Sequence, residues 1–158
     1  MVEKKSKGFT LIELLIVIAI IIILAAIVFV ALNPLQRFQQ ARNAKRWADI
    51  TAVLNAIKID QIDNGGSYMA AIDPGMANGT YHEIGTCASG ASCTGQAVEA
   101  GCVDLAGLVT DGYLGILPTD PQSGTAAQTG YYLMKSATGI ITVGACEAEA
   151  GETIKASR

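Results

Sequence analysis

The stretch Phe9–Leu32 reads FTLIELLIVIAIIIILAAIVFVAL, and it decides the fold of the 158-residue chain. From Leu14 to Leu32 it holds 19 consecutive apolar residues. At the helical rise of about 1.5 Å per residue, 24 residues cover about 36 Å, more than the roughly 30 Å hydrocarbon core of a bilayer. A helix in a soluble core is seldom apolar on every face for this length. The stretch therefore predicts a helix inserted in a membrane.

The flanks of this stretch bear on how it is inserted. Lys4, Lys5 and Lys7 provide the basic start of a secretory signal, but the apolar part is longer than the roughly 7–15 residues of a cleaved signal. We therefore expect the helix to be kept as an anchor. Basic residues flank both ends, so the positive-inside rule selects no orientation. All four cysteines follow the helix, which favours an oxidising compartment on that side and a cytoplasmic N-terminus.

Glu13 places a carboxylate inside the apolar stretch. An acidic residue at the centre of a membrane helix costs about 2.5–3.5 kcal/mol on insertion scales. Glu13 either lies near enough to the helix end to snorkel to the interface, or it meets a cation supplied by a partner.

Residues Lys4–Glu13 read KKSKGFTLIE, which resembles the class III signal of type IV prepilins and type II secretion pseudopilins. In that family, prepilin peptidase cleaves after the glycine on the cytoplasmic side, methylates the new amino terminus and leaves the apolar helix in place. The resemblance implies cleavage between Gly8 and Phe9 and N-methylation of Phe9. It also implies three partners: the peptidase, the pilus assembly machinery of the inner membrane, and further copies of the chain in a helical filament.

Cleavage at Gly8 would place a cationic amine at the start of the helix. Side chains of a helix lean toward its N-terminus, and Glu13 lies four residues, or about one turn, from Phe9. The carboxylate can therefore reach the amine of its own chain or of a neighbour. A charge left unpaired in lipid is costly, so a neighbour that supplies the cation favours docking in register.

Asn33-Pro34 interrupts the apolar run, and Pro34 cannot donate a hydrogen bond to the carbonyl of Val30. We expect a kink or a local break there, either as part of assembly or as a simple helix break at the membrane surface. Many type IV pilins carry a proline about one turn earlier, at the position of Val30. The helical pattern then resumes to about Ile62, with Trp47, Ile50, Leu54 and Ile57 as the stripe expected to cover a sheet.

Charge is divided along the chain. Residues 1–59 carry 8 Lys and Arg against 3 Asp and Glu, a net charge of +5, whereas residues 60–158 carry 3 against 11, a net charge of −8. The acidic half argues against a specific nucleic-acid partner. The basic residues of 37–46 have three open interpretations: binding of lipid headgroups, pairing with the acidic head of another subunit, or simple solvation.

Turn residues at 63–67 end the helix, and strands are expected at 81–84, 131–135 and 140–144. Asp63–Gly65, Leu117–Pro121, Gly124 and Tyr131–Leu133 resemble the head of major pseudopilins and related short pilins. In those pseudopilins, a loop near this region holds calcium. Asp111 and Asp120 are the available acidic ligands. Residues 122–129 lack carboxylates and calcium needs about 6–8 oxygen ligands, so no metal is predicted.

The four cysteines have no C-x2-C pair, and His82 is the one histidine, so disulfides are expected rather than a zinc site. Four cysteines allow three pairings. We expect Cys87–Cys93, which closes a short loop, and Cys102–Cys146, which ties the late strand to an earlier loop much as pilins staple their C-terminal region.

The sequence thus predicts an α+β pilin fold: a long N-terminal α-helix, apolar in its transmembrane half and amphipathic in its second half, packed on a small antiparallel sheet. The expected parts are a cleaved leader at 1–8, a transmembrane or filament-core helix at 9–34, an amphipathic helix at 35–63 and a globular head at 64–158.

The expected function is that of a type IV pilus subunit, located in the cytoplasmic membrane before assembly and in a surface filament afterwards. The alternatives are a major pseudopilin of a type II secretion system and a monomeric membrane-anchored exported domain that binds a ligand. With one histidine and no catalytic motif, we expect neither an enzyme nor a cofactor.

Overall fold

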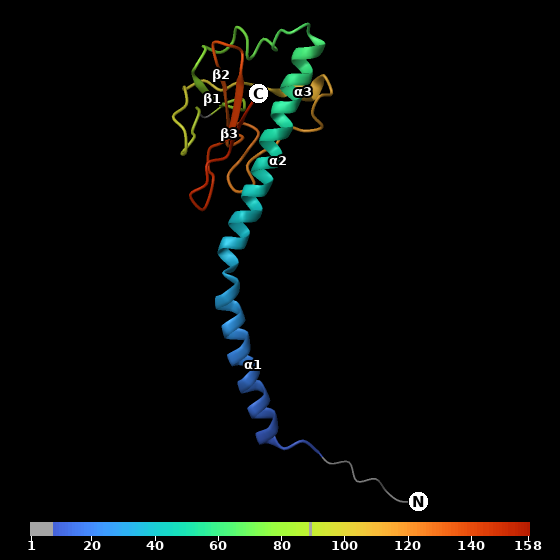
Figure 1. The fold of residues 1–158 in the computed structure, drawn as a ribbon, viewed down its shortest axis with the longest axis vertical. Coiled ribbons are helices and arrows are strands. Elements are labelled where there is room, and N and C mark those ends of the chain that lie inside the picture. Colours follow the sequence, from blue (N-terminus) through green and yellow to red (C-terminus); the bar gives the residue numbers. More distant parts are fainter. Residues whose placement is uncertain (1–7, 89) are drawn as a thin grey trace, which may run out of the picture. The chain divides into compact units, whose positions relative to one another are not determined.

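The computed structural model describes residues 8–88 and 90–158, so most of the expected leader lies outside the described residues (Figure 1). The chain forms two compact units. The first ends at Phe38, and the second, the head unit, is Gln39–Arg158. The elements are α1 (Leu11–Leu32), α2 (Pro34–Asp63), β1 (Tyr81–Glu83), α3 (Ala106–Thr110), β2 (Tyr131–Lys135), β3 (Ile141–Ala145) and β4 (Lys155–Ser157).

Helix α1 contains the apolar run and buries none of its side chains within the chain. Among the described residues, one helical stretch, Leu11–Asp63, contains a window long and apolar enough to cross a membrane. A helix that is apolar on every face and uncovered by its own chain requires lipid or neighbouring chains around it.

The interruption at Asn33-Pro34 is present. Asn33 has a left-handed backbone (φ 40°, ψ 70°) that ends α1, and Pro34 opens α2. Proline is favoured at the first helical position because its missing N–H would have no partner there. The Asn33 carbonyl accepts from the backbone N–H of Gln36 at 3.1 Å, which starts the new helix at once.

The buried face of α2 differs from the predicted stripe at one position. Ile50, Leu54 and Ile57 are buried, as expected, but Trp47 is 41% exposed. The preceding residue, Arg46, is buried instead. The prediction missed it because it considered apolar residues alone. Successive helical residues point about 100° apart, so burying Arg46 turns Trp47 outward.

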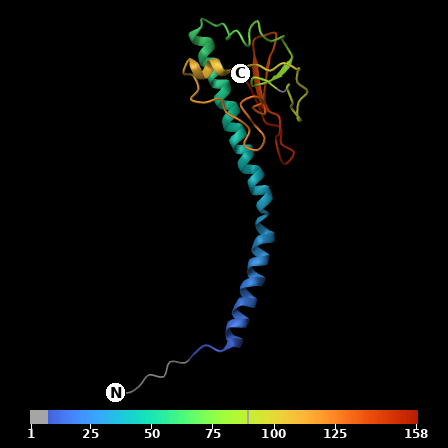
Figure 2. The same cartoon turned by 180° about the vertical axis from the view of Figure 1, so that it is seen from behind.

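The head unit contains an antiparallel sheet in the order β1-β2-β3-β4. Figures 1 and 2 show the head unit from opposite sides. The strands expected at 81–84, 131–135 and 140–144 correspond to β1, β2 and β3, with ends shifted by at most one residue. The sequence reading missed β4, whose Lys-Ala-Ser sequence has weak strand propensity and which forms by pairing with β3.

The core of the head unit lies between α2 and the sheet. It joins Ile50 and Ile57 of α2 to Leu133 of β2 and Val143 of β3, and it includes Leu108 of α3. The fold is therefore α+β: a long N-terminal helix followed by a small four-stranded antiparallel sheet.

Candidate functional site

Gly8 and Phe9 lie in exposed, non-helical chain directly before α1. A protease needs an extended and accessible backbone around the bond that it cleaves, and the first helical residue follows two positions after Phe9. The local structure is thus compatible with the cleavage expected between Gly8 and Phe9, which stays a prediction.

Glu13 forms a capping box with Thr10 at the start of α1. The Thr10 backbone N–H and hydroxyl both donate to Glu13 Oε2, at 2.8 and 2.7 Å, and the Glu13 backbone N–H donates to Thr10 Oγ1 at 3.3 Å. The spacing T-x-x-E is a readable signal for this motif, which the sequence reading missed. The carboxylate therefore has polar partners within its own first turn, in addition to any cation that cleavage would create.

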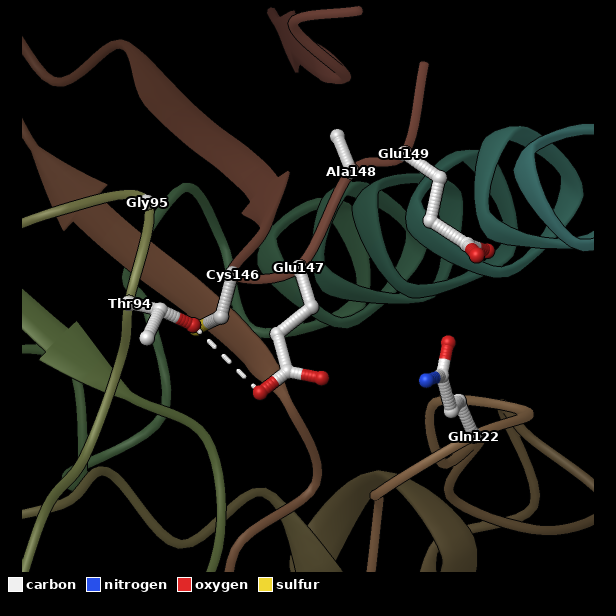
Figure 3. A pocket seen from close by; sticks show the side chains of 7 residues that line it. All are labelled: Thr94, Gly95, Gln122, Cys146, Glu147, Ala148 and Glu149. Atoms are coloured by element: carbon white, nitrogen blue, oxygen red, sulfur yellow. Dashed lines mark hydrogen bonds between the residues drawn. The ribbon is translucent and has the colours of Figure 1, made fainter. Parts of the chain in front are cut away.

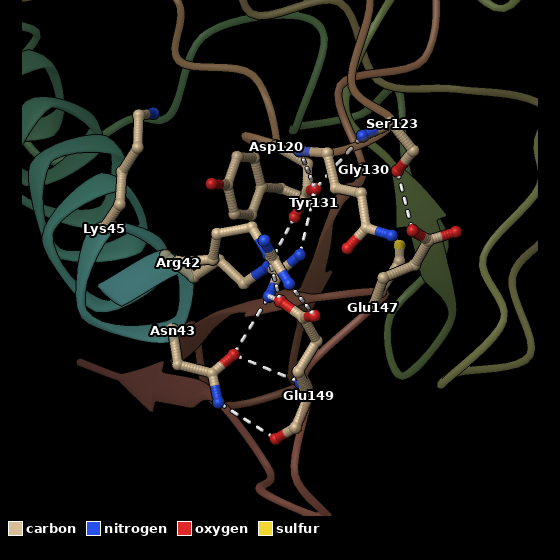
Figure 4. Close-up of polar contacts among 12 residues, drawn as sticks. Arg42, Asn43, Lys45, Asp120, Ser123, Gly130, Tyr131, Glu147 and Glu149 are labelled. Carbon is tan, nitrogen blue, oxygen red and sulfur yellow. Dashed lines mark hydrogen bonds and ion pairs between the residues drawn. The ribbon is translucent and has the colours of Figure 1, made fainter. Parts of the chain in front are cut away.

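A cluster of ion pairs in the head unit fastens the C-terminal region to α2 (Figure 4). Arg46 donates to Asp120 from Nε at 2.5 Å and from Nη2 at 3.1 Å, and from Nη1 to Glu149 at 2.7 Å. Arg42 donates to both oxygens of Glu149 at 2.7 and 2.5 Å. The Asn43 side chain bonds the Glu149 backbone on both its carbonyl and its N–H. Arg46 and Asp120 are completely buried, so this cluster is desolvated at its centre.

These contacts keep the cluster charged. The hydrogen bonds from Arg42 lower the pKa of Glu149 from 4.5 to about 2. Burial acts in the opposite direction, and the hydrogen bond from Arg46 lowers the pKa further. Burial opposes ionisation of Asp120, but hydrogen bonds from Arg46 and the Gln122 backbone outweigh it and lower the pKa of that carboxyl. Burial also opposes the charge on Arg46, yet its bonds to Asp120 and Glu149 raise its pKa.

The cluster decides how two of the basic residues of 37–46 are used. Arg42 and Arg46 pair with acidic groups of their own head, so pairing with another subunit's acids is wrong for these two side chains. Lys45 pairs with Asp49 at 2.6 Å on the surface. The sequence separation of 74 residues between Arg46 and Asp120 left no local signal for the buried pair.

The two aspartates considered for calcium have different surroundings in the structure. Both oxygens of Asp120 are used by Arg46, and Oδ1 also accepts from the backbone of Gln122 and Ser123. Asp111 is exposed at the C-terminal end of α3. A guanidinium therefore occupies the position at the Asp120 carboxylate that a cation would need.

The disulfides are Cys87–Cys102 and Cys93–Cys146, so the expected pairing is wrong. Ile84 and Val103 form an isolated parallel bridge, which brings the chain after β1 beside the chain around Cys102. The backbone N–H of Gly95 donates to the Cys146 carbonyl at 2.8 Å and holds the second pair of segments together. Backbone pairing between distant segments, rather than nearness in sequence, selects the partners.

Glu83 is a buried carboxylate beside the first disulfide. It accepts from the Ser92 backbone N–H at 2.6 Å and from that of Gly130 at 3.4 Å, and its carboxylate lies within 4.8 Å of the sulfurs of Cys87 and Cys102. This trio has the residue types of a metal site, but sulfurs joined in a disulfide are not thiolate ligands. The proximity instead bears on how easily the disulfide is reduced.

We expect Glu83→Gln to speed reduction of Cys87–Cys102 by dithiothreitol about three- to tenfold. A nearby carboxylate repels the attacking thiolate and disfavours the negative charge on the sulfur that must leave, and both effects slow exchange. Timed alkylation and mass mapping measure the rate, with Cys93–Cys146 as the internal control. Equal rates in the two proteins would contradict this electrostatic protection.

A surface pocket of about 380 Å³ lies beside the second disulfide (Figure 3). Glu147, in this pocket, accepts from Thr94 at 3.3 Å and from Ser123 at 2.7 Å. Cys146 is in its disulfide, and the carboxylate of Glu149 belongs to the ion-pair cluster. The Thr94 hydroxyl and the Glu147 carboxylate of this lining bond to each other, and what the lining offers is hydrogen bonding.

Comparison with known proteins addresses the N-terminal segment. Residues 4–29 match the family model of the prokaryotic N-terminal methylation motif, a structural rather than enzymatic family. No curated protein and no solved structure matches the chain. The motif and the apolar helix together indicate a membrane-anchored precursor. The match confirms the resemblance drawn from residues 4–13: this chain carries the class III prepilin signal of the type IV pilins and pseudopilins.

Proposed function

We propose that the chain is the structural subunit of a type IV pilus. The observation that carries this proposal is the placement of Glu13, a carboxylate in a helix that is otherwise apolar and uncovered, one turn after the bond that the signal marks for cleavage. Neighbouring copies would both cover the apolar faces of α1 and supply a cationic Phe9 amine.

The proposed sequence of events follows from the same features. The precursor is held in the cytoplasmic membrane by α1, with its N-terminus in the cytoplasm. Prepilin peptidase cleaves between Gly8 and Phe9 and methylates the Phe9 amine. The assembly machinery then moves the subunit from lipid into a helical filament, in which α1 exchanges lipid contacts for contacts with other copies. Pro34 would let α1 adjust its direction during this step, since α1 ends at Leu32 and a new helix begins at Pro34.

A major pseudopilin of a type II secretion system is the alternative. It would share the processing signal and the anchored helix. Two features favour the pilus subunit. The Cys93–Cys146 disulfide staples the C-terminal region of the head, and the Asp120 carboxylate is taken by Arg46 rather than offered to calcium. Sheared cell-surface material should contain filaments of this chain, and electron microscopy with mass spectrometry of their subunit tests this.

We expect subunits from such filaments to begin at a methylated Phe9, and Gly8→Leu to block this processing. A leucine side chain on the acyl side of the bond crowds the protease subsite that glycine leaves open, so the variant should accumulate at full length. Mass spectrometry of membrane and filament fractions measures both. Gly101→Leu, the same change at an exposed head position with no neighbouring atom within 4 Å of the added Cβ, is the control.

Two results would overturn the proposal. A filament-derived subunit that begins at Met1 would show that the signal is not processed. Absence of filaments of the wild-type chain, in cells that hold the processed subunit in their membrane, would favour a monomeric anchored domain.

A further inference from the structure

An apolar groove in the head unit serves none of the features described above. It has a volume of about 450 Å³ and lies along α3 and the chain that follows it. One residue of its lining, Ile116, is 78% exposed. A groove of this size and lining accommodates a few large apolar side chains. Its apolar lining consists of Ala106, Val109, Ile116, Leu117 and Ala126.

The one charged side chain in the groove lining is an acid. Exposed Asp104 belongs to the lining, which contains no Lys, Arg or His, and exposed Asp111 follows directly after α3. An occupant that presents apolar side chains beside basic residues would therefore complement both the surface and the charge of this groove.

The first turns of α2 have this combination. Leu35 and Phe38 are each 64% exposed and lie three positions apart, on one face of the helix. They follow Pro34 and so lie beyond the apolar run that spans the lipid. The same stretch is basic, since Arg37 lies between them in sequence.

We propose that the groove of one copy receives the Leu35–Phe38 turn of a second copy in the filament. This inference rests on the proposed function and names a contact surface for it outside the apolar core. The groove and the turn are different surfaces, so the contact is heterologous: each bound pair leaves one groove and one turn free. A heterologous contact whose rotation does not close a ring repeats along an open helical polymer, which is the form that the proposed filament requires.

Cysteine cross-linking in trans tests the contact. Ile116→Cys and Phe38→Cys chains are expressed together with the wild-type chain, so that mixed filaments form. Each native cysteine is in a disulfide, so the introduced thiols are the free ones. Mild oxidation of sheared filaments should give a reducible dimer that joins residue 116 of one chain to residue 38 of another. Ile140→Cys with Phe38→Cys is the matched control, since Ile140 is an exposed isoleucine that does not line the groove.

A second measurement does not depend on cross-linking. Ile116→Asp should lower the yield of sheared filament about tenfold relative to Ile140→Asp, at equal levels of membrane-held subunit, because it adds a charge to an apolar contact.

The outcomes separate this inference from the proposed function. Filaments without the 116–38 dimer, or with as much 140–38 dimer, would overturn the groove contact and leave the filament intact. Equal filament yields from the two aspartate variants would also overturn it. Failure of the wild-type chain to form filaments would instead overturn the proposed function itself.

Discussion

Arg46→Met should lower the free energy of unfolding of the head unit by about 3–5 kcal/mol, the usual cost of removing one partner of a buried ion pair. Arg46 and Asp120 are both completely buried, so the variant would leave the Asp120 carboxylate without its cation and without water. Urea unfolding of the full chain in detergent measures this, and Trp47, the one tryptophan and the neighbour of Arg46, reports it by fluorescence.

Two control variants separate the buried pair from charge in general. Lys45→Met removes a surface ion pair one residue away and should cost no more than about 1 kcal/mol. Adding Asp120→Asn to Arg46→Met removes the stranded charge but keeps an oxygen that can accept from the Gln122 backbone, so it should recover part of the loss. An Arg46→Met protein as stable as Lys45→Met would show that the buried pair contributes nothing.

Acid should reduce the difference between Arg46→Met and the wild type. In the wild type, the pKa of Glu149 is lowered from 4.5 to about 2, and that of Asp120 is also lowered. Their contribution is therefore present above about pH 4.5 and is lost as the pH falls toward 2. In the variant, burial without a cation raises the pKa of Asp120, so protonation stabilises the folded state. Unfolding measured at pH 7 and pH 4 should show a smaller difference at the lower pH.

Glu13→Val should leave membrane insertion and cleavage intact while it nearly abolishes filament assembly. Valine removes the cost of a carboxylate in lipid, so the lone subunit should insert at least as well as before. What it loses is the partner of a Phe9 amine in a neighbouring copy. A desolvated pair that loses one member typically costs about 3–5 kcal/mol, which corresponds to more than a hundredfold in subunit affinity. Fractionation of cells into membrane-held subunit and sheared filament measures both effects.

The capping box makes a control variant necessary, because valine also removes the Glu13 contacts to Thr10. Glu13→Gln retains a residue that closes a capping box but carries no charge. If the charge drives assembly, both variants lose filaments. If the helix start is what matters, the glutamine variant keeps them. A normal filament yield from Glu13→Gln would therefore contradict pairing with the amine.

The sequence by itself determined the features that depend on short-range spacing. An uninterrupted apolar run makes a helix whose faces are all apolar, whatever follows it in the chain. Asn33-Pro34 breaks that helix because proline lacks the N–H that the helix needs. Strands β1, β2 and β3 were predicted from the sequence as well, since strand-forming residues and the turns that bound them act over a few positions. The processing signal is also local, because a peptidase reads a short stretch of residues.

Only the tertiary structure decided which distant residues meet. The Cys87–Cys102 pairing depends on the bridge between Ile84 and Val103, and no cysteine spacing encodes that backbone contact. Arg46 shows the same limit for charge. An arginine in a basic segment is expected to be solvated, because burial of a charge is unfavourable unless a partner of opposite charge is buried with it. Asp120 is that partner, 74 residues away, and the folded chain brings it to Arg46 and turns Trp47 toward the surface.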